Sequence, residues 1–201
     1  MAELDRVLDV LLHDLRSPLS VASGYVRLLR MDKLDSFEAR EKAWMQSATA
    51  LTRIAHLCDE AVGFLSTAEG ATRAIPVAQL TSRVRQHCQD RGMACDDTAS
   101  VLDGPAFQAQ TDVDRLAEAV ATLVGLQHSE SHPARLTVSS DPRALVFTVP
   151  LETAWADDSY DPWKLPGLGA ALACHTISLA SGEVRANRDL TISFPLQESH
   201  A

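Results

Sequence analysis

LDRVLDVLLHDLRSPLSVASGYVRLL, residues 4–29, carries the pattern from which the fold of this chain is predicted. Its apolar residues recur at alternating steps of four and three, which is the spacing of the seam of a helical bundle. In the same register His13 falls on the side away from the seam, and Ser17 lies one turn later on that outer surface. The sequence therefore predicts a long helix that displays His13 to solvent. The residues assigned to its seam are Leu4, Leu8, Leu11, Leu15, Pro18, Ala22, Tyr25 and Leu29.

A second amphipathic helix is predicted from about residue 39 to residue 65, after a break at residues 31–38 in which Ser36 is a candidate N-cap. Two such helices with a short connection form an antiparallel hairpin. A single hairpin cannot cover both of its apolar stripes, so we expect two copies to pair as a four-helix bundle in a homodimer. The apolar positions assigned to the second helix are Trp44, Ala48, Leu51, Ile54, Cys58, Ala61 and Leu65.

The second half of the chain has a different pattern, in which helical segments alternate with short strand-like runs. This alternation predicts an α/β sandwich, with helices on one face of a mixed sheet, and so an α+β class for the whole chain. The predicted domains are a helical hairpin at 1–66, a linker at 67–75 and the sandwich at 76–201. Within the sandwich we expect helices at 77–91, 112–127 and 167–180, and strands after residue 92 and at 134–140, 143–151, 183–186 and 190–196.

Composition and charge exclude several kinds of partner. The 201 residues carry a net charge of −9, whereas a nucleic-acid surface needs clustered Lys and Arg. No apolar run approaches the ~18–20 residues of a membrane span, and no secretory signal precedes the first helix. The four cysteines include no Cys-x-x-Cys pair. We therefore expect a cytoplasmic protein with neither a nucleic-acid nor a membrane partner.

The stretch around His13 combines residues that suit phosphoryl chemistry. A displayed imidazole is a good nucleophile for phosphorus, and the neighbouring Asp14 can orient the ring or hold its proton. Arg16 can attract a phosphate or an acidic partner surface. Pro18 has no N–H to donate to the carbonyl of Asp14, and a proline inside a helix costs about 3 kcal/mol or more. Strain of this kind often accompanies a functional site.

The string from His13 to Leu19, HDLRSPL, resembles the phosphoacceptor motif of sensor histidine kinases, and the similarity continues through Tyr25. The resemblance implies that residues 1–66 are a dimerisation and histidine-phosphotransfer domain and that residues 76–201 are a Bergerat-like, ATP-binding-type domain. It also implies that His13 is the phosphoacceptor and Asp14 its orienting acid or base. Ser17 stands where the family places a Thr or Asn that serves phosphatase activity.

The nucleotide motifs of that family are degraded here. The segment TDVDRL, residues 111–116, resembles the entry to the family's asparagine-bearing helix, but Thr122 and Leu126 stand at the asparagine positions, and leucine cannot coordinate magnesium. The glycine-rich adenine motif is missing around Glu152. Gly167 and Gly169 remain from the last glycine motif, as a vestige at the start of a helix. We therefore expect no ATP, no bound metal and no autokinase activity.

These observations together predict a histidine phosphotransfer protein that exchanges a phosphoryl group between His13 and response-regulator receiver domains. The resemblance extends to dimeric histidine phosphotransferases, in which the receiver supplies the magnesium ion. Arg16 and Pro18 are then candidates for contact with the receiver. Three alternatives stay open: a pseudo-histidine-kinase that acts by binding alone, a response-regulator phosphatase that uses Ser17, and a kinase with an unusual nucleotide site.

Overall fold

The computed structural model describes residues 2–65, 72–96, 106–126, 134–140, 143–150, 167–186 and 189–196. The chain divides into two compact units, Met1–Ser66 and Thr67–Ala201, and each has its own architecture. Among the described residues, no helix is both long enough and apolar enough to cross a membrane.

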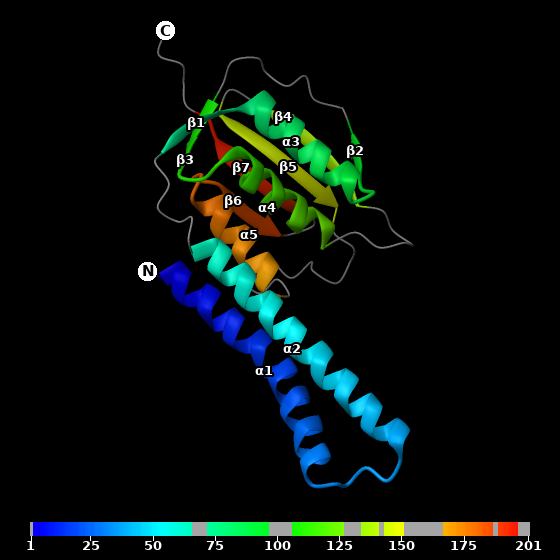
Figure 1. Ribbon diagram of the computed structural model, residues 1–201. Helices are drawn as coiled ribbons and strands as arrows, with labels where there is room; N and C mark the ends of the chain where they lie inside the picture. The colour runs from blue at the N-terminus through cyan, green and yellow to red at the C-terminus, as the bar shows by residue number, and fades with distance from the viewer. Residues whose placement is uncertain are drawn as a thin grey trace. The chain divides into compact units, whose positions relative to one another are not determined.

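The first unit is a pair of long antiparallel helices, α1 (Ala2–Arg30) and α2 (Phe37–Leu65), which confirms the predicted hairpin (Figure 1). The start of α2 is fixed by Ser36, whose Oγ accepts a hydrogen bond of 3.1 Å from the backbone N–H of Ala39. Because this bond satisfies one of the unpaired N–H groups of the first turn, Ser36 is the N-cap that the sequence predicts.

The seam between α1 and α2 consists mainly of small side chains, and it differs from the predicted one. Trp44 and Leu51, predicted to point inward, are 63% and 55% exposed, and Leu8 is 40% exposed. The reason is that α2 carries two adjacent apolar stripes, and the stripe of small residues is the one that packs on α1. The buried residues of the hairpin are Val7, Pro18, Ala22, Ala43, Ser47, Ala50, Leu57 and Ala61.

Many of the large apolar side chains of the hairpin lie on its surface. At 3.6 residues per turn, most of them lie along the same side of the two helices. We call this side the outer apolar face, and its residues are Leu8, Leu12, Leu19 and Val26 of α1 and Trp44, Leu51 and Val62 of α2. A single chain does not cover this face, and the homodimer stays a prediction.

The second unit confirms the predicted mixed sheet with helices on one face. Its five-stranded sheet has the order β2-β4-β5-β7-β6, with β2 parallel to β4 and the other neighbours antiparallel. Figure 1 shows the three helices together over one face of this sheet. The strands are β2 (Ala94–Asp96), β4 (Arg135–Ser140), β5 (Ala144–Pro150), β6 (Glu183–Ala186) and β7 (Asp189–Pro195), and the helices are α3 (Val77–Asp90), α4 (Val113–Gly125) and α5 (Leu168–Ser178).

Two further strands were not predicted. β1 (Arg73–Pro76) pairs antiparallel with β3 (Ala106–Ala109), so residues 73–75 belong to a strand and not to the predicted linker. Ile75 lies opposite Phe107 in this pair, and both side chains are buried. Each of these short segments is defined as a strand by its pairing with the other, which the sequence of one segment alone does not show.

The core of the second unit is organised around three phenylalanines. Phe107 stacks on Phe194 with 5.1 Å between ring centroids, and Phe147 meets Phe194 edge-on at 6.1 Å. Gly182 lies so close to this cluster that an added Cβ would be 2.7 Å from the Phe194 ring and 2.7 Å from Ile177. A side chain at position 182 would therefore displace the core.

Candidate functional site

His13 stands out from the middle of α1 with 81% of its side chain exposed, as its position on the helix predicts. Its Nδ1 lies 3.3 Å from Oδ1 of Asp14, whose side chain is only 18% exposed. An ionised carboxylate can only accept, so in the neutral ring Nδ1 carries the proton and donates to Asp14. The lone pair of Nε2 is then directed away from Asp14 and is available to an electrophile.

His13 lies on the rim of a groove between α1 and α2 with a volume of about 330 Å³. Ser17 and Val21 follow His13 on the same side of α1, at successive turns of the helix. The facing wall belongs to α2, and the groove is lined by His13, Asp14, Ser17, Pro18, Val21, Gln46, Thr49, Ala50 and Arg53. The groove therefore brings together four of the residues singled out from the sequence with a polar edge of the second helix.

Arg16 is not among the groove residues, although it follows His13 closely in the sequence. Arg16 lies three residues after His13 on α1. At 3.6 residues per turn it is on the flank of His13 opposite to Ser17 and Val21, and its side chain is exposed outside the groove. The cation that lines the groove is Arg53, which sequence reasoning missed. Thr49 and Arg53 are one turn apart on α2, and this polar spacing beside the small-residue stripe is the signal that could have found them.

Pro18 is buried in the wall of the groove, and α1 continues through it without a break. Its ring packs in the α1–α2 seam, and its missing N–H removes one hydrogen bond of the helix one turn after His13. The site thus includes a point where the backbone of α1 lacks one of its hydrogen bonds and the buried Pro18 ring packs instead.

The positions of the nucleotide motifs in the second unit make contacts with other parts of the protein. The Thr122 hydroxyl is 3.3 Å from Nη1 of Arg91, and Leu126 packs against the hydrophobic core. An added Cβ on Gly169 would be 4.0 Å from the Thr122 methyl group, so the start of α5 lies close to α4. Gly167 caps α5 with φ of +91°, a conformation that favours glycine. Gly167 therefore has a structural reason to be present without a nucleotide, whereas the space around Gly169 would admit a Cβ.

These residues do not fit a magnesium–nucleotide complex. The Thr122 hydroxyl contacts an arginine, and Leu126 is an apolar side chain packed against the core. The two residues therefore offer no pair of hard oxygen ligands. Within the described ranges there is no group of three or more His, Cys, Asp or Glu side chains placed to hold a metal ion. Glu152, which stands near the expected adenine motif, lies outside the described residues.

No protein-family model and no curated protein sequence matches the chain. Solved structures do match it. The histidine kinase AdeS of Acinetobacter baumannii aligns over 94% of this chain and 98% of its own, with a TM-score of 0.52 and 15% identity. The histidine kinase ThkA, solved in complex with the response regulator TrrA, aligns over 91% of this chain and 59% of its own, with a TM-score of 0.54 and 14% identity. The protein therefore has the fold of the histidine kinases, from its helical hairpin through its α/β sandwich.

Proposed function

We propose that this protein is a histidine phosphotransfer protein that accepts a phosphoryl group on His13 from a response-regulator receiver domain and returns it to one. The observation that carries this proposal is the state of His13: an exposed imidazole, with Nδ1 against Asp14, on the rim of an open groove. A phosphotransfer protein needs no more than an oriented nucleophile and a surface on which the receiver can dock.

The transfer step follows from this geometry. The lone pair of Nε2 attacks the phosphorus of the receiver's phospho-aspartate, and a P–N bond forms as the bond from phosphorus to the carboxylate oxygen breaks. The electron pair leaves with the receiver's carboxylate. His13 keeps its proton on Nδ1 and becomes a positively charged phosphoimidazole, which the Asp14 carboxylate stabilises. The receiver would bind the magnesium ion.

Two further observations support the proposal. ThkA, which shares the fold, was solved with a response regulator, and that partner class suits the groove beside His13. By helical position the outer apolar face lies on the opposite side of the hairpin from the groove. Two copies paired through the outer apolar face would therefore leave both histidines accessible, which is what a homodimeric carrier requires.

The test is a radiolabel transfer assay with the wild type, His13→Ala and His56→Ala. His56 is a matched control because it is also exposed, at 72%, and also lies beside a carboxylate, 3.5 Å from Glu60, but it does not line the groove. Each protein is incubated with Mg-ATP alone and with receiver domains from the source organism that carry phosphate. We expect label on the wild type and on His56→Ala with a phosphorylated receiver only, and none on His13→Ala.

The other outcomes identify the alternatives. Label from Mg-ATP alone would show a working kinase and would overturn the proposal. Receiver binding without label on any variant would favour a binding-only pseudo-histidine-kinase. Loss of phosphate from the receiver without label on His13, and its prevention by Ser17→Ala, would favour a phosphatase.

A further inference from the structure

The groove beside His13 contains one cation among its lining residues, Arg53 of α2. We propose that Arg53 binds the phosphoryl group at His13, through its guanidinium, during transfer and in the phosphohistidine state. This inference rests on the proposed function and adds a residue on the second helix to the transfer site. The transfer site would then consist of residues from both α1 and α2, and not of the His13 motif alone.

The placement of Arg53 supports this role. It shares the groove with His13 but comes from the opposite wall, so its guanidinium can reach the space that a phosphoryl group on Nε2 would enter. The side chain is exposed, and among the described residues it has no ion-pair partner. Several other arginines are paired, such as Arg40 with Asp32 and Arg83 with Asp114. The charge of Arg53 is therefore available to a ligand.

The charge of the groove shows why a cation is needed there. Asp14 places a carboxylate beside the ring, and this carboxylate repels an incoming phosphoryl group even as it stabilises the charged imidazole. A guanidinium on the facing wall offsets the repulsion, and its forked donors match two phosphoryl oxygens. Gln46 adds a neutral hydrogen-bond donor to the same wall, whereas the Thr49 hydroxyl donates to the carbonyl of Met45 at 3.0 Å.

A small phosphodonor separates binding of the phosphoryl group from docking of a partner. Phosphoramidate carries a phosphoryl group without a protein surface, and it can label an accessible histidine directly. We would measure the rate of His13 phosphorylation by phosphoramidate and by a phosphorylated receiver for the wild type, Arg53→Gln and Arg53→Lys. Arg27→Gln is the control, since it removes the same charge from an exposed position of α1 outside the groove. Thermal unfolding checks that each variant is folded.

We expect Arg53→Gln to slow labelling by both donors about tenfold to a hundredfold, the range for loss of a charge-assisted hydrogen bond. Arg53→Lys should recover part of the rate, and Arg27→Gln should match the wild type. If Arg53→Gln slowed only the receiver reaction, Arg53 would contact the partner's surface and the inference would be wrong. Wild-type rates for Arg53→Gln with both donors would overturn it while leaving the proposed function intact. A wild type that neither donor labels would overturn both.

Discussion

The two units of this protein place their large apolar side chains in opposite ways. In the second unit they are inside: the largest fully buried side chains of the described chain, among them Phe107, Phe147 and Phe194, all belong to it. In the hairpin they are outside: the exposed large apolar residues of the described chain, from Leu8 to Val62, all belong to the hairpin. The second unit therefore has a closed apolar core, whereas the hairpin leaves an apolar face uncovered by its own chain.

This difference is matched by a difference in chemistry. The hairpin keeps an exposed nucleophile, a carboxylate beside it and a cation on the facing wall. In the second unit, Leu126 packs against the core and the Thr122 hydroxyl contacts Arg91, in the region where the histidine kinases that the sequence resembles would hold a nucleotide. A fold can keep its packing when the residues of a site change, because packing and site depend on different residues.

The largest effect should come from the core of the second unit. Phe194→Ala removes the ring on which Phe107 and Phe147 both pack, and it should lower the free energy of unfolding of that unit by about 3–5 kcal/mol. The matched control is Phe37→Ala, which removes the same ring from a position that is 82% exposed and should cost little. Urea unfolding, monitored by hydrogen exchange in β5 and β7 for Phe194→Ala and in α2 for Phe37→Ala, would measure both. Similar costs for the two variants would contradict a dense core.

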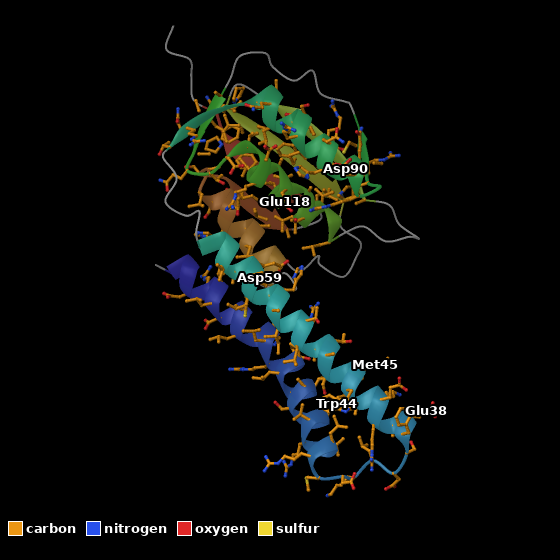
Figure 2. The ribbon with its side chains drawn as sticks, in the orientation of Figure 1. Glu38, Trp44, Met45, Asp59, Asp90 and Glu118 are labelled. Carbon is orange, nitrogen blue, oxygen red and sulfur yellow. The ribbon has the colours of Figure 1, made fainter. Side chains whose placement is uncertain are left out.

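The next effect concerns the outer apolar face. Trp44→Glu should raise the dimer dissociation constant about a hundredfold, since a carboxylate buried in an apolar interface costs several kcal/mol. Met45→Glu is the control. Met45 is similarly exposed, at 59%, but it is the next residue along α2 and so lies on a different side of the helix from Trp44 (Figure 2). Analytical ultracentrifugation over a concentration series gives the constants. A monomeric wild type, or equal effects of the two variants, would show that this face does not pair two chains.

A pH-dependent effect should come from Cys88 of the second unit. Burial raises the pKa of the Cys88 thiol to about 12, and the neighbouring Cys95 adds to the rise. Above pH 9 the unfolded chain ionises at Cys88 and the folded chain does not, so stability is lost as pH rises. At pH 10 the loss is about 1.4 kcal/mol. Between pH 8 and pH 10, the urea midpoint should fall further for the wild type than for Cys88→Ala. Equal falls would refute the assignment of this pH dependence to Cys88.

The smallest effect should come from a surface ion pair between α3 and α4. Arg83 Nε lies 3.1 Å from Oδ1 of Asp114, but both side chains are more than half exposed. Water and salt screen such a pair, so Arg83→Gln should cost about 0.5 kcal/mol or less. Thermal unfolding at low and high salt would show this, and the difference between variant and wild type should vanish in high salt. A cost above about 2 kcal/mol would mean that the helices depend on surface charge as well as on the core.

The sequence predicted those features that depend on one segment at a time. The long helices and the strands of the five-stranded sheet follow from periodicity, and the exposure of His13 follows from its register on α1. β1 and β3 were missed because each is stabilised by pairing with the other, and neither segment shows that pairing by itself. The inward face of α2 was misassigned because its apolar residues form two neighbouring stripes, and periodicity does not tell which stripe meets α1. Arg53 was missed for a related reason: its closeness to the His13 site exists only once the two helices pair.

The small-residue seam of the hairpin has a consequence for the order of folding events. Ala43, Ala50 and Ala61 let α1 and α2 approach closely, but they bury little apolar area, so pairing within one chain stabilises the hairpin only weakly. In the proposed homodimer most of the stabilisation arrives when a second chain covers the outer apolar face. Formation of the hairpin is then a second-order process whose rate depends on protein concentration, whereas the second unit folds at a first-order rate of its own. The protein would acquire its phosphoacceptor only where two chains meet.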